Sequence, residues 1–180
     1  MVDINKLKEQ AKQAQEKGLV KDQSKETSGD FKYEPPAAGP CVARLISYVE
    51  IGNHAPKVDK FKKGAQPKAI VQFELLGKKH AKEIEVDGVK KTIYPVITEE
   101  LSISGSKKSW FYKLVHALDY GRGFTNIAFM VGEAYKITVL HNEAEDNGVK
   151  KVFANIRDDS GWKIGAPVQE VEGEDGELEV

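Results

Sequence analysis

Two apolar runs separated by a lysine-rich segment constrain this chain more than any other feature. The runs are CVARLISYVEIG over residues 41–52 and AIVQFELL over residues 69–76. Their content of Val, Ile, Leu, Phe and Tyr is typical of half-buried strands. The segment between them, HAPKVDKFKKGAQPK, contains five lysines and one acid. The sequence therefore predicts two neighbouring strands that present a cationic loop.

The first run separates into two faces, because successive side chains of a strand point to opposite sides. The even positions are more polar and basic, so we expect them to be exposed. The expected inward residues are Ala43, Leu45, Ser47, Val49 and Ile51, and the expected outward residues are Val42, Arg44, Ile46, Tyr48 and Glu50.

The later elements follow the same kind of pattern. Further strands are expected over residues 92–104, 133–142 and 150–157, the first of them interrupted on its inward face by Pro95 and Glu99. A charged excursion over 78–91 is expected to turn at Asp87-Gly88. A helix is expected over 107–118 with Ser106 as its N-cap, followed by a loop over 124–132.

The order of three strands, one helix and two strands predicts an all-β fold with one helix. It is the order of a five-stranded OB-fold barrel. We expect residues 1–30 to form a polar arm with a short helix over 2–18, residues 31–166 to form the barrel, and residues 167–180 to form a disordered acidic tail.

Charge is distributed very unevenly along the chain. The formal net charge is -1, yet the last fourteen residues hold six acids and no base, which leaves residues 1–166 with a formal charge of +5. A basic body favours a polyanionic partner, and an acidic tail is either a partner-binding segment or a solubilising one. The acids of the tail are Glu170, Glu172, Glu174, Asp175, Glu177 and Glu179.

Single-stranded nucleic acid needs cations along its phosphates and aromatic faces for its bases. Lys57, Lys60, Lys62 and Lys63 supply cations in the loop, and Phe61 lies among them without apolar neighbours, which favours base contact over a loop anchor. Outward strand positions supply further candidates, although each tyrosine and phenylalanine there is as well explained by half-burial. These candidates are Arg44, Tyr48, Tyr94, Lys151, Phe153 and Arg157.

Enzymatic and membrane functions are not favoured. No histidine pairs with another histidine or with the single cysteine at a metal-ligand spacing, and no phosphate-binding glycine loop follows a strand. The acid pair Glu99-Glu100 and the group Glu143, Glu145 and Asp146 are best explained as solvated charge. No apolar run reaches the roughly 20 residues of a membrane span. We expect no catalysis, cofactor or metal, and a cytoplasmic location because a lone cysteine forms no internal disulfide.

Five segments together resemble the OB-fold single-stranded DNA-binding proteins of tailed bacteriophages and prophages. They are ARLISYVEIG (43–52), VQFEL (71–75), SKKSWFYKL (106–114), GRGF (121–124) and VGEAYKITVLH (131–141). The resemblance implies sequence-nonspecific coating of single-stranded DNA during phage replication and recombination in the cytoplasm of an infected bacterium. It also implies an acidic tail that meets replication proteins such as a polymerase or a helicase-primase. The lysine-rich loop and the 78–91 excursion depart from the usual pattern of that family.

Two alternatives remain open from the sequence alone. The first is an OB-fold module that bridges proteins of a phage replication or virion complex, with the lysine loop meeting an acidic partner. The second is an RNA-binding OB domain, because contact with the 2′-hydroxyl depends on geometry that a sequence does not reveal. Homo-oligomer formation is compatible with each of them.

Overall fold

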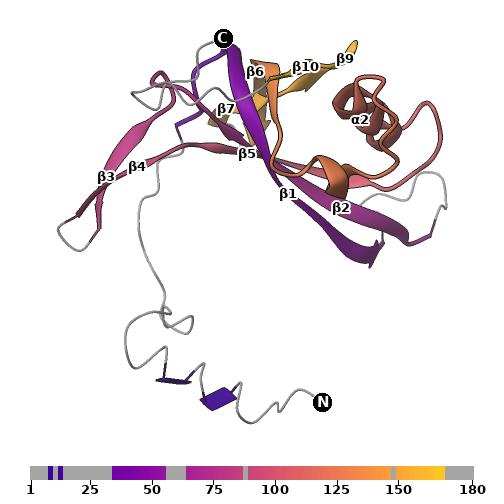
Figure 1. Cartoon of the computed structure of the whole chain (residues 1–180), viewed down its shortest axis with the longest axis horizontal. Helices are drawn as coiled ribbons and strands as arrows, with labels where there is room; N and C mark the ends of the chain where they lie inside the picture. Colours follow the sequence, from indigo (N-terminus) through magenta and orange to yellow (C-terminus); the bar gives the residue numbers. More distant parts are fainter. Residues whose placement is uncertain are drawn as a thin grey trace. The chain divides into compact units, whose positions relative to one another are not determined.

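The computed structural model describes residues 8–9, 12–13, 34–55, 64–86, 89–146 and 149–168. The chain divides into two compact units, Met1–Glu34 and Pro35–Val180. In the first unit residues 8–9 and 12–13 are helical, as expected within 2–18, and the rest of that expected helix lies outside the described residues. The second unit is mostly β-sheet with one α-helix (Figure 1).

The main sheet has the strand order β10-β6-β1-β2-β5, and β7 pairs with the later part of β6. Two short ladders, β3 with β4 and β8 with β9, lie outside this path. Among the described strands no ladder joins β5 to β7, so hydrogen bonds do not close a barrel. In chain order the elements are β1 (Gly39–His54), β2 (Gln66–Leu75), β3 (Lys82–Val86), β4 (Val89–Ile93), β5 (Val96–Ser102), α2 (Trp110–Asp119), the 3-10 helix η1 (Ile127–Met130), β6 (Ala134–Asp146), β7 (Val149–Asn155), β8 (Arg157–Asp158), β9 (Gly161–Trp162) and β10 (Ile164–Val168).

β1 is long because it belongs to two ladders. Its first part, Gly39 to Arg44, pairs with β6, and the stretch from Ala43 to His54 pairs with β2. The β2 ladder changes register between Leu45 and Ser47 and again between Glu50 and Gly52. An extra residue at such a bulge reverses the facing of the residues beyond it and bends the strand.

Beyond the first bulge, the side chains of β1 face the opposite way from what we expected. Tyr48, expected outside, pairs with buried Val71 and packs against the core, whereas Val49, expected inside, is 49% exposed. Val42, also expected outside, is buried in a small second cluster with Leu76 and Ala134. The expected alternation therefore holds for positions 43 to 46, where Ile46 is exposed as expected, and it reverses at Tyr48 and Val49.

The main core lies between the inner face of the sheet, α2 and η1. It contains Phe73 and Leu75 of β2 and the fully buried Tyr135 of β6. The apolar stripe of the helix packs here as expected, with Leu114 and Leu118 fully buried. The segment 124–132, expected to be a loop, instead contains η1, whose Ile127 and Met130 are core residues.

The helix begins three residues later than expected. Ser109, not Ser106, is the N-cap, because its hydroxyl accepts a hydrogen bond from the Tyr112 amide at 3.1 Å and donates one to the Ser104 carbonyl at 2.8 Å. The other end of α2 stops at Tyr120, which adopts a left-handed conformation with φ 50°. Gly121, the next residue, also has a positive φ, of 80°.

Arg122 joins the end of α2 to the start of β6. Its guanidinium donates to both carboxylate oxygens of Glu133 at 3.0 and 2.7 Å, to the Tyr135 hydroxyl at 3.1 Å and to the Leu118 carbonyl at 2.9 Å. A two-pronged pair of this kind fixes orientation as well as position. Arg122 of the GRGF segment therefore fixes the end of α2 to the start of β6.

The excursion over 78–91 forms the ribbon β3–β4, with its strands paired as a hairpin around residues 87–88, which themselves lie outside the described residues. Within this unit the ribbon extends away from the other strands (Figure 1). The expected third strand breaks at Tyr94 and Pro95, where an interruption was expected, and Ile93, expected inward, is 43% exposed. The sheet also continues past the expected boundary at 166, because Pro167 and Val168 pair with β6.

Replacing the cap should test the observed helix start. Ser109→Ala should lower the free energy of unfolding by about 1 kcal/mol, because an amide of the first turn loses its acceptor. Ser106→Ala is the matched control and should have a smaller effect. Urea unfolding of the two variants checks this, and a larger loss for Ser106→Ala would contradict the assignment.

Candidate functional site

Five of the eleven expected nucleic-acid contacts lie outside the described residues, and so do the six acids of the expected partner-binding tail. The five contacts are Lys57, Lys60, Phe61, Lys62 and Lys63 in the β1–β2 connection. The ends of the connection are placed, because His54 and Gln66 pair with each other. The lysine-rich segment is therefore the loop of a β-hairpin.

The described candidates are spread over several surfaces. Arg44 lies 3.9 Å from Glu74, and Tyr48 packs against Phe111 with its hydroxyl donating to Glu50 at 2.7 Å. Tyr94 is half-buried between β4 and β5. Lys151 and Phe153 are exposed on β7, as expected from their parity. The described residues therefore do not gather all the expected contacts in one place.

Among these candidates, Arg157 differs most from its expected position. Expected to face outward, it pairs with Glu99 of β5 at 3.1 Å, and their side chains are 27% and 8% exposed. The expectation that Glu99 is solvated is therefore wrong. The guanidinium also lies 5.0 Å from the ring centre of Trp110 and 5.5 Å from that of Trp162.

Two tryptophans complete this contact between β5 and the β7–β9 region. Their rings meet edge to face at 6.1 Å, and the Trp162 indole donates to the Trp110 carbonyl at 2.9 Å. Trp110 packs on the core as expected, and Trp162 covers the same region. Together with Arg157 and Glu99, these tryptophans form what we call the closing cluster, because its side chains join β5 to α2 and to the β8–β9 ladder, which directly follows β7.

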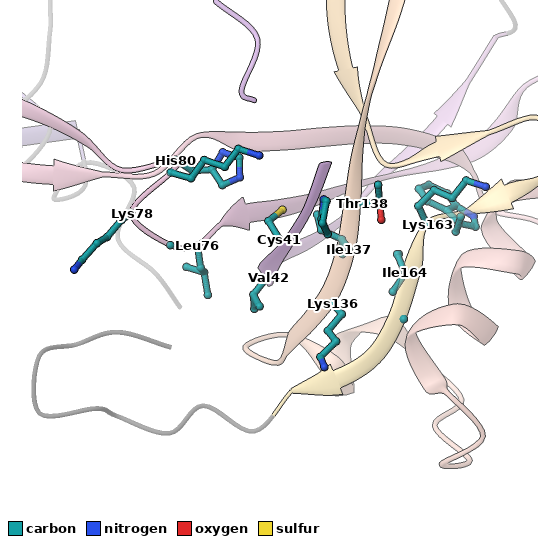
Figure 2. A pocket seen from close by; sticks show the side chains of 15 residues that line it. Cys41, Val42, Leu76, Lys78, His80, Lys136, Ile137, Thr138, Lys163 and Ile164 are labelled. Carbon is teal, nitrogen blue, oxygen red and sulfur yellow. The ribbon is translucent and has the colours of Figure 1, made fainter. Parts of the chain in front are cut away.

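A second feature is a pocket of about 610 Å³ beside the first part of β1. Figure 2 shows Cys41 and Ile137 between His80 on one side and Lys163 on the other. Four separate segments build it: the first part of β1, the turn after β2, β6, and the stretch from β9 to β10. The lining residues are Pro40, Cys41, Val42, Leu76, Gly77, Lys78, Lys79, His80, Lys136, Ile137, Thr138, Trp162, Lys163, Ile164 and Gly165.

His80 is the unusual group of this pocket. Its side chain is buried, at 4% exposure, and among the described residues neither ring nitrogen has a hydrogen-bond partner. Burial lowers the pKa of the imidazole, and the neighbouring Lys79 ammonium lowers it further. Burial likewise raises the pKa of the Cys41 thiol. The pocket therefore keeps a neutral imidazole and a neutral thiol against an apolar floor.

The sequence could not reveal this pocket, because its parts are far apart along the chain. One signal was available: Lys78, Lys79 and His80 directly follow an apolar strand, with Gly77 between. Gly77 has φ +96°, which a glycine adopts without strain, and its carbonyl accepts from the His80 amide at 3.0 Å. That tight turn places His80 beside β1.

Removing Arg157 should test the closing cluster. Arg157→Ala should lower the free energy of unfolding by about 2 kcal/mol at neutral pH, because the Glu99 carboxylate loses its charged donor. Lys90→Ala is the control, because Lys90 and Glu83 form a pair whose side chains are 79% and 74% exposed, and an exposed pair contributes at most about 1 kcal/mol. Equal losses in urea unfolding would contradict a special role for the cluster.

The loss of unfolding free energy caused by Arg157→Ala should depend on pH. Burial raises the pKa of Glu99, and Arg157 offsets part of the rise. A raised carboxyl pKa means that the folded state binds the proton more tightly than the unfolded state does. The stabilisation that this proton gives is fully present below pH 4.5 and is lost as the pH rises through the folded pKa of Glu99. The loss caused by Arg157→Ala should therefore be smaller at pH 5 than at pH 8, and a larger loss at pH 5 would contradict this account.

Replacing His80 should stabilise the protein. His80→Leu should raise the free energy of unfolding by about 1 kcal/mol, because the buried nitrogens lack partners. A lowered histidine pKa makes stability fall as pH drops below 6.5, so the variant should lose less stability than the wild type between pH 7.5 and 5.5. His54→Leu, at an exposed position, is the control and should change little. Destabilisation by His80→Leu at both pH values would contradict the prediction.

In the part of the chain that the structure describes, no helix has the length and apolarity needed to cross a bilayer. No protein-family model matches the chain, and no curated protein or solved structure matches it either. Fold and side-chain geometry therefore carry the functional argument.

Proposed function

We propose that the chain is a non-enzymatic, OB-type binding protein for single-stranded DNA. The observation that carries the proposal is the connectivity: β1 pairs with both β2 and β6, β2 pairs with β5, and α2 lies between β5 and β6 along the chain. With β7 as the fifth strand, this supports a partly open barrel. In such barrels the strand 1–2 and strand 4–5 loops flank the nucleic acid.

Charge and aromatic residues support the same proposal. The lysine-rich segment is the connection between β1 and β2, which is the first of those two loops. The second loop, between β6 and β7, is followed by Lys150 and Lys151 and by Phe153, which is 43% exposed. Cations for phosphates and an aromatic for bases are the two requirements of this ligand.

A protein-binding role is the second candidate, and one surface favours it. On the outer face of β1, β2 and β5, Val49 is 49% and Val96 is 42% exposed, and Lys68 forms an ion pair with Glu100. An apolar surface with neutralised charge suits another protein better than a phosphate chain. If Val49→Asp abolished association with a replication protein but left DNA binding intact, both roles would apply.

Salt dependence should test the DNA proposal. A labelled 30-nucleotide oligo-dT should bind tightly at low salt and weakly at high salt, because each neutralised phosphate releases counterions. Changing Lys57, Lys60, Lys62 and Lys63 together to Gln should reduce the slope of log K against log salt by about 3, at roughly 0.7 for each lost contact. A matched variant with Gln at Lys90 and Lys91, on the β3–β4 ribbon, should leave the slope unchanged.

The same titration against duplex DNA and single-stranded RNA separates the alternatives. Preference for RNA would favour the RNA-binding reading. Failure to bind any of the three would contradict the proposal and leave the protein-binding surface as the better candidate.

Truncation should test the acidic tail. Because β10 ends at Val168, the chain should be cut after that residue, so that the sheet stays whole. We expect tighter binding of oligo-dT at low salt, since six negative charges are removed from the protein. Unchanged affinity in a fluorescence anisotropy titration would make the tail a solubilising segment.

A further inference from the structure

The pocket beside β1 has the dimensions and lining of a ligand site. Its volume of about 610 Å³ lies within the range of small-molecule sites, and its floor is mainly apolar. Trp162 adds an aromatic wall, and the Cys41 thiol lies on the floor. A ligand for this space therefore needs an apolar or aromatic body.

The charged side chains around the pocket all have the same sign. Four lysines line it and no acid does. Lys79 and Lys163 are held in place, the first donating to the Ala38 carbonyl at 2.9 Å and the second lying 2.9 Å from Asp158. Lys136 is exposed at the pocket, and Lys78 is the fourth. This rim favours an anionic group on the ligand.

His80 adds a requirement that an apolar anion alone would not meet. A neutral imidazole has one N–H donor and one nitrogen acceptor, and here both are buried without partners among the described residues. A buried polar group of this kind costs free energy unless a partner arrives. The missing partner should therefore present an acceptor and a donor of its own.

We propose that this pocket binds one nucleotide unit, with its base on the apolar floor beside His80 and its phosphate at the lysine rim. A nucleobase edge carries donors and acceptors side by side, and its faces are apolar. The inference rests on the proposed function, because the bound nucleotide is taken to be part of a single-stranded DNA chain. The proposed pocket contact lies apart from the two loops that flank the nucleic acid and apart from the outer face of β1, β2 and β5.

An acidic peptide is the main competing ligand. Its carboxylates would suit the lysines, but a carboxylate beside His80 would favour the imidazolium, whose charge burial disfavours. A neutral base edge requires no such charge. The nucleotide is therefore the better match to this particular histidine.

Cys41 provides the test, because the chain has a single cysteine and its thiol lines the pocket. The full chain is treated with a thiol reagent at pH 8.5, alone and with dTMP, dAMP, oligo-dT, inorganic phosphate, or a peptide of residues 169–180. Saturating mononucleotide should slow modification at least tenfold, and phosphate and peptide should have little effect. Oligo-dT binding is measured separately by anisotropy.

Variants should identify the groups responsible. His80→Leu should weaken mononucleotide protection at least tenfold, whereas His80→Gln, whose amide also has a donor and an acceptor, should stay within threefold. Lys136→Ala should weaken protection severalfold and make it less dependent on salt. Lys107→Ala, in the turn before α2, is the control and should have no effect.

The outcomes separate this inference from the proposed function. If oligo-dT binds but no nucleotide protects Cys41, the pocket inference is wrong and the DNA proposal stands. Protection by mononucleotides without oligo-dT binding would keep the pocket and overturn the DNA proposal. Protection by the acidic peptide alone, or by phosphate as well as by dTMP, would overturn the nucleotide assignment.

Discussion

The membership of β1 in two ladders is the constraint on which this fold depends. One strand must turn from β6 to β2, and it does so by inserting extra residues at two bulges. The first insertion turns Tyr48 toward the core and leaves Val49 in solvent. Aromatic burial and apolar exposure on this strand therefore have the same cause. The bend also separates the outer face of β1, β2 and β5 from the pocket at the start of β1.

Local patterns predicted what neighbouring residues decide. The helix near residues 107–118 follows from short-range periodicity, and the break near Pro95 follows from the missing amide of proline. The bulge in β1 does not, because it is set by pairing with two other strands. Glu99 was misplaced for the same reason: its partner Arg157 lies 58 positions later. A charged residue at an inward-facing position of a strand can be buried with an oppositely charged partner, and only the fold reveals a partner that is distant in sequence.

The candidate site was less predictable than the fold. Composition identified the lysine-rich segment, and the strand pairing makes that segment a hairpin loop. The pocket depends on four separate segments meeting. Its most unusual property is a histidine without a hydrogen-bond partner among the described residues, which follows from how these segments are arranged in space and not from local sequence. Proteins tolerate such a cost where function uses it. His80 is therefore informative because it is energetically unfavourable in the free protein.

The closing cluster also affects how copies of this protein meet one another. A sheet that stays open leaves strand edges that can pair with a neighbouring chain and begin aggregation. Here the inward charge of Glu99 on β5 and the bulky rings of Trp110 and Trp162 occupy the gap beside that edge. An added strand would have to displace Arg157 and leave a buried carboxylate without its counterion. The same contact therefore also works against edge-to-edge association of this sheet with another chain.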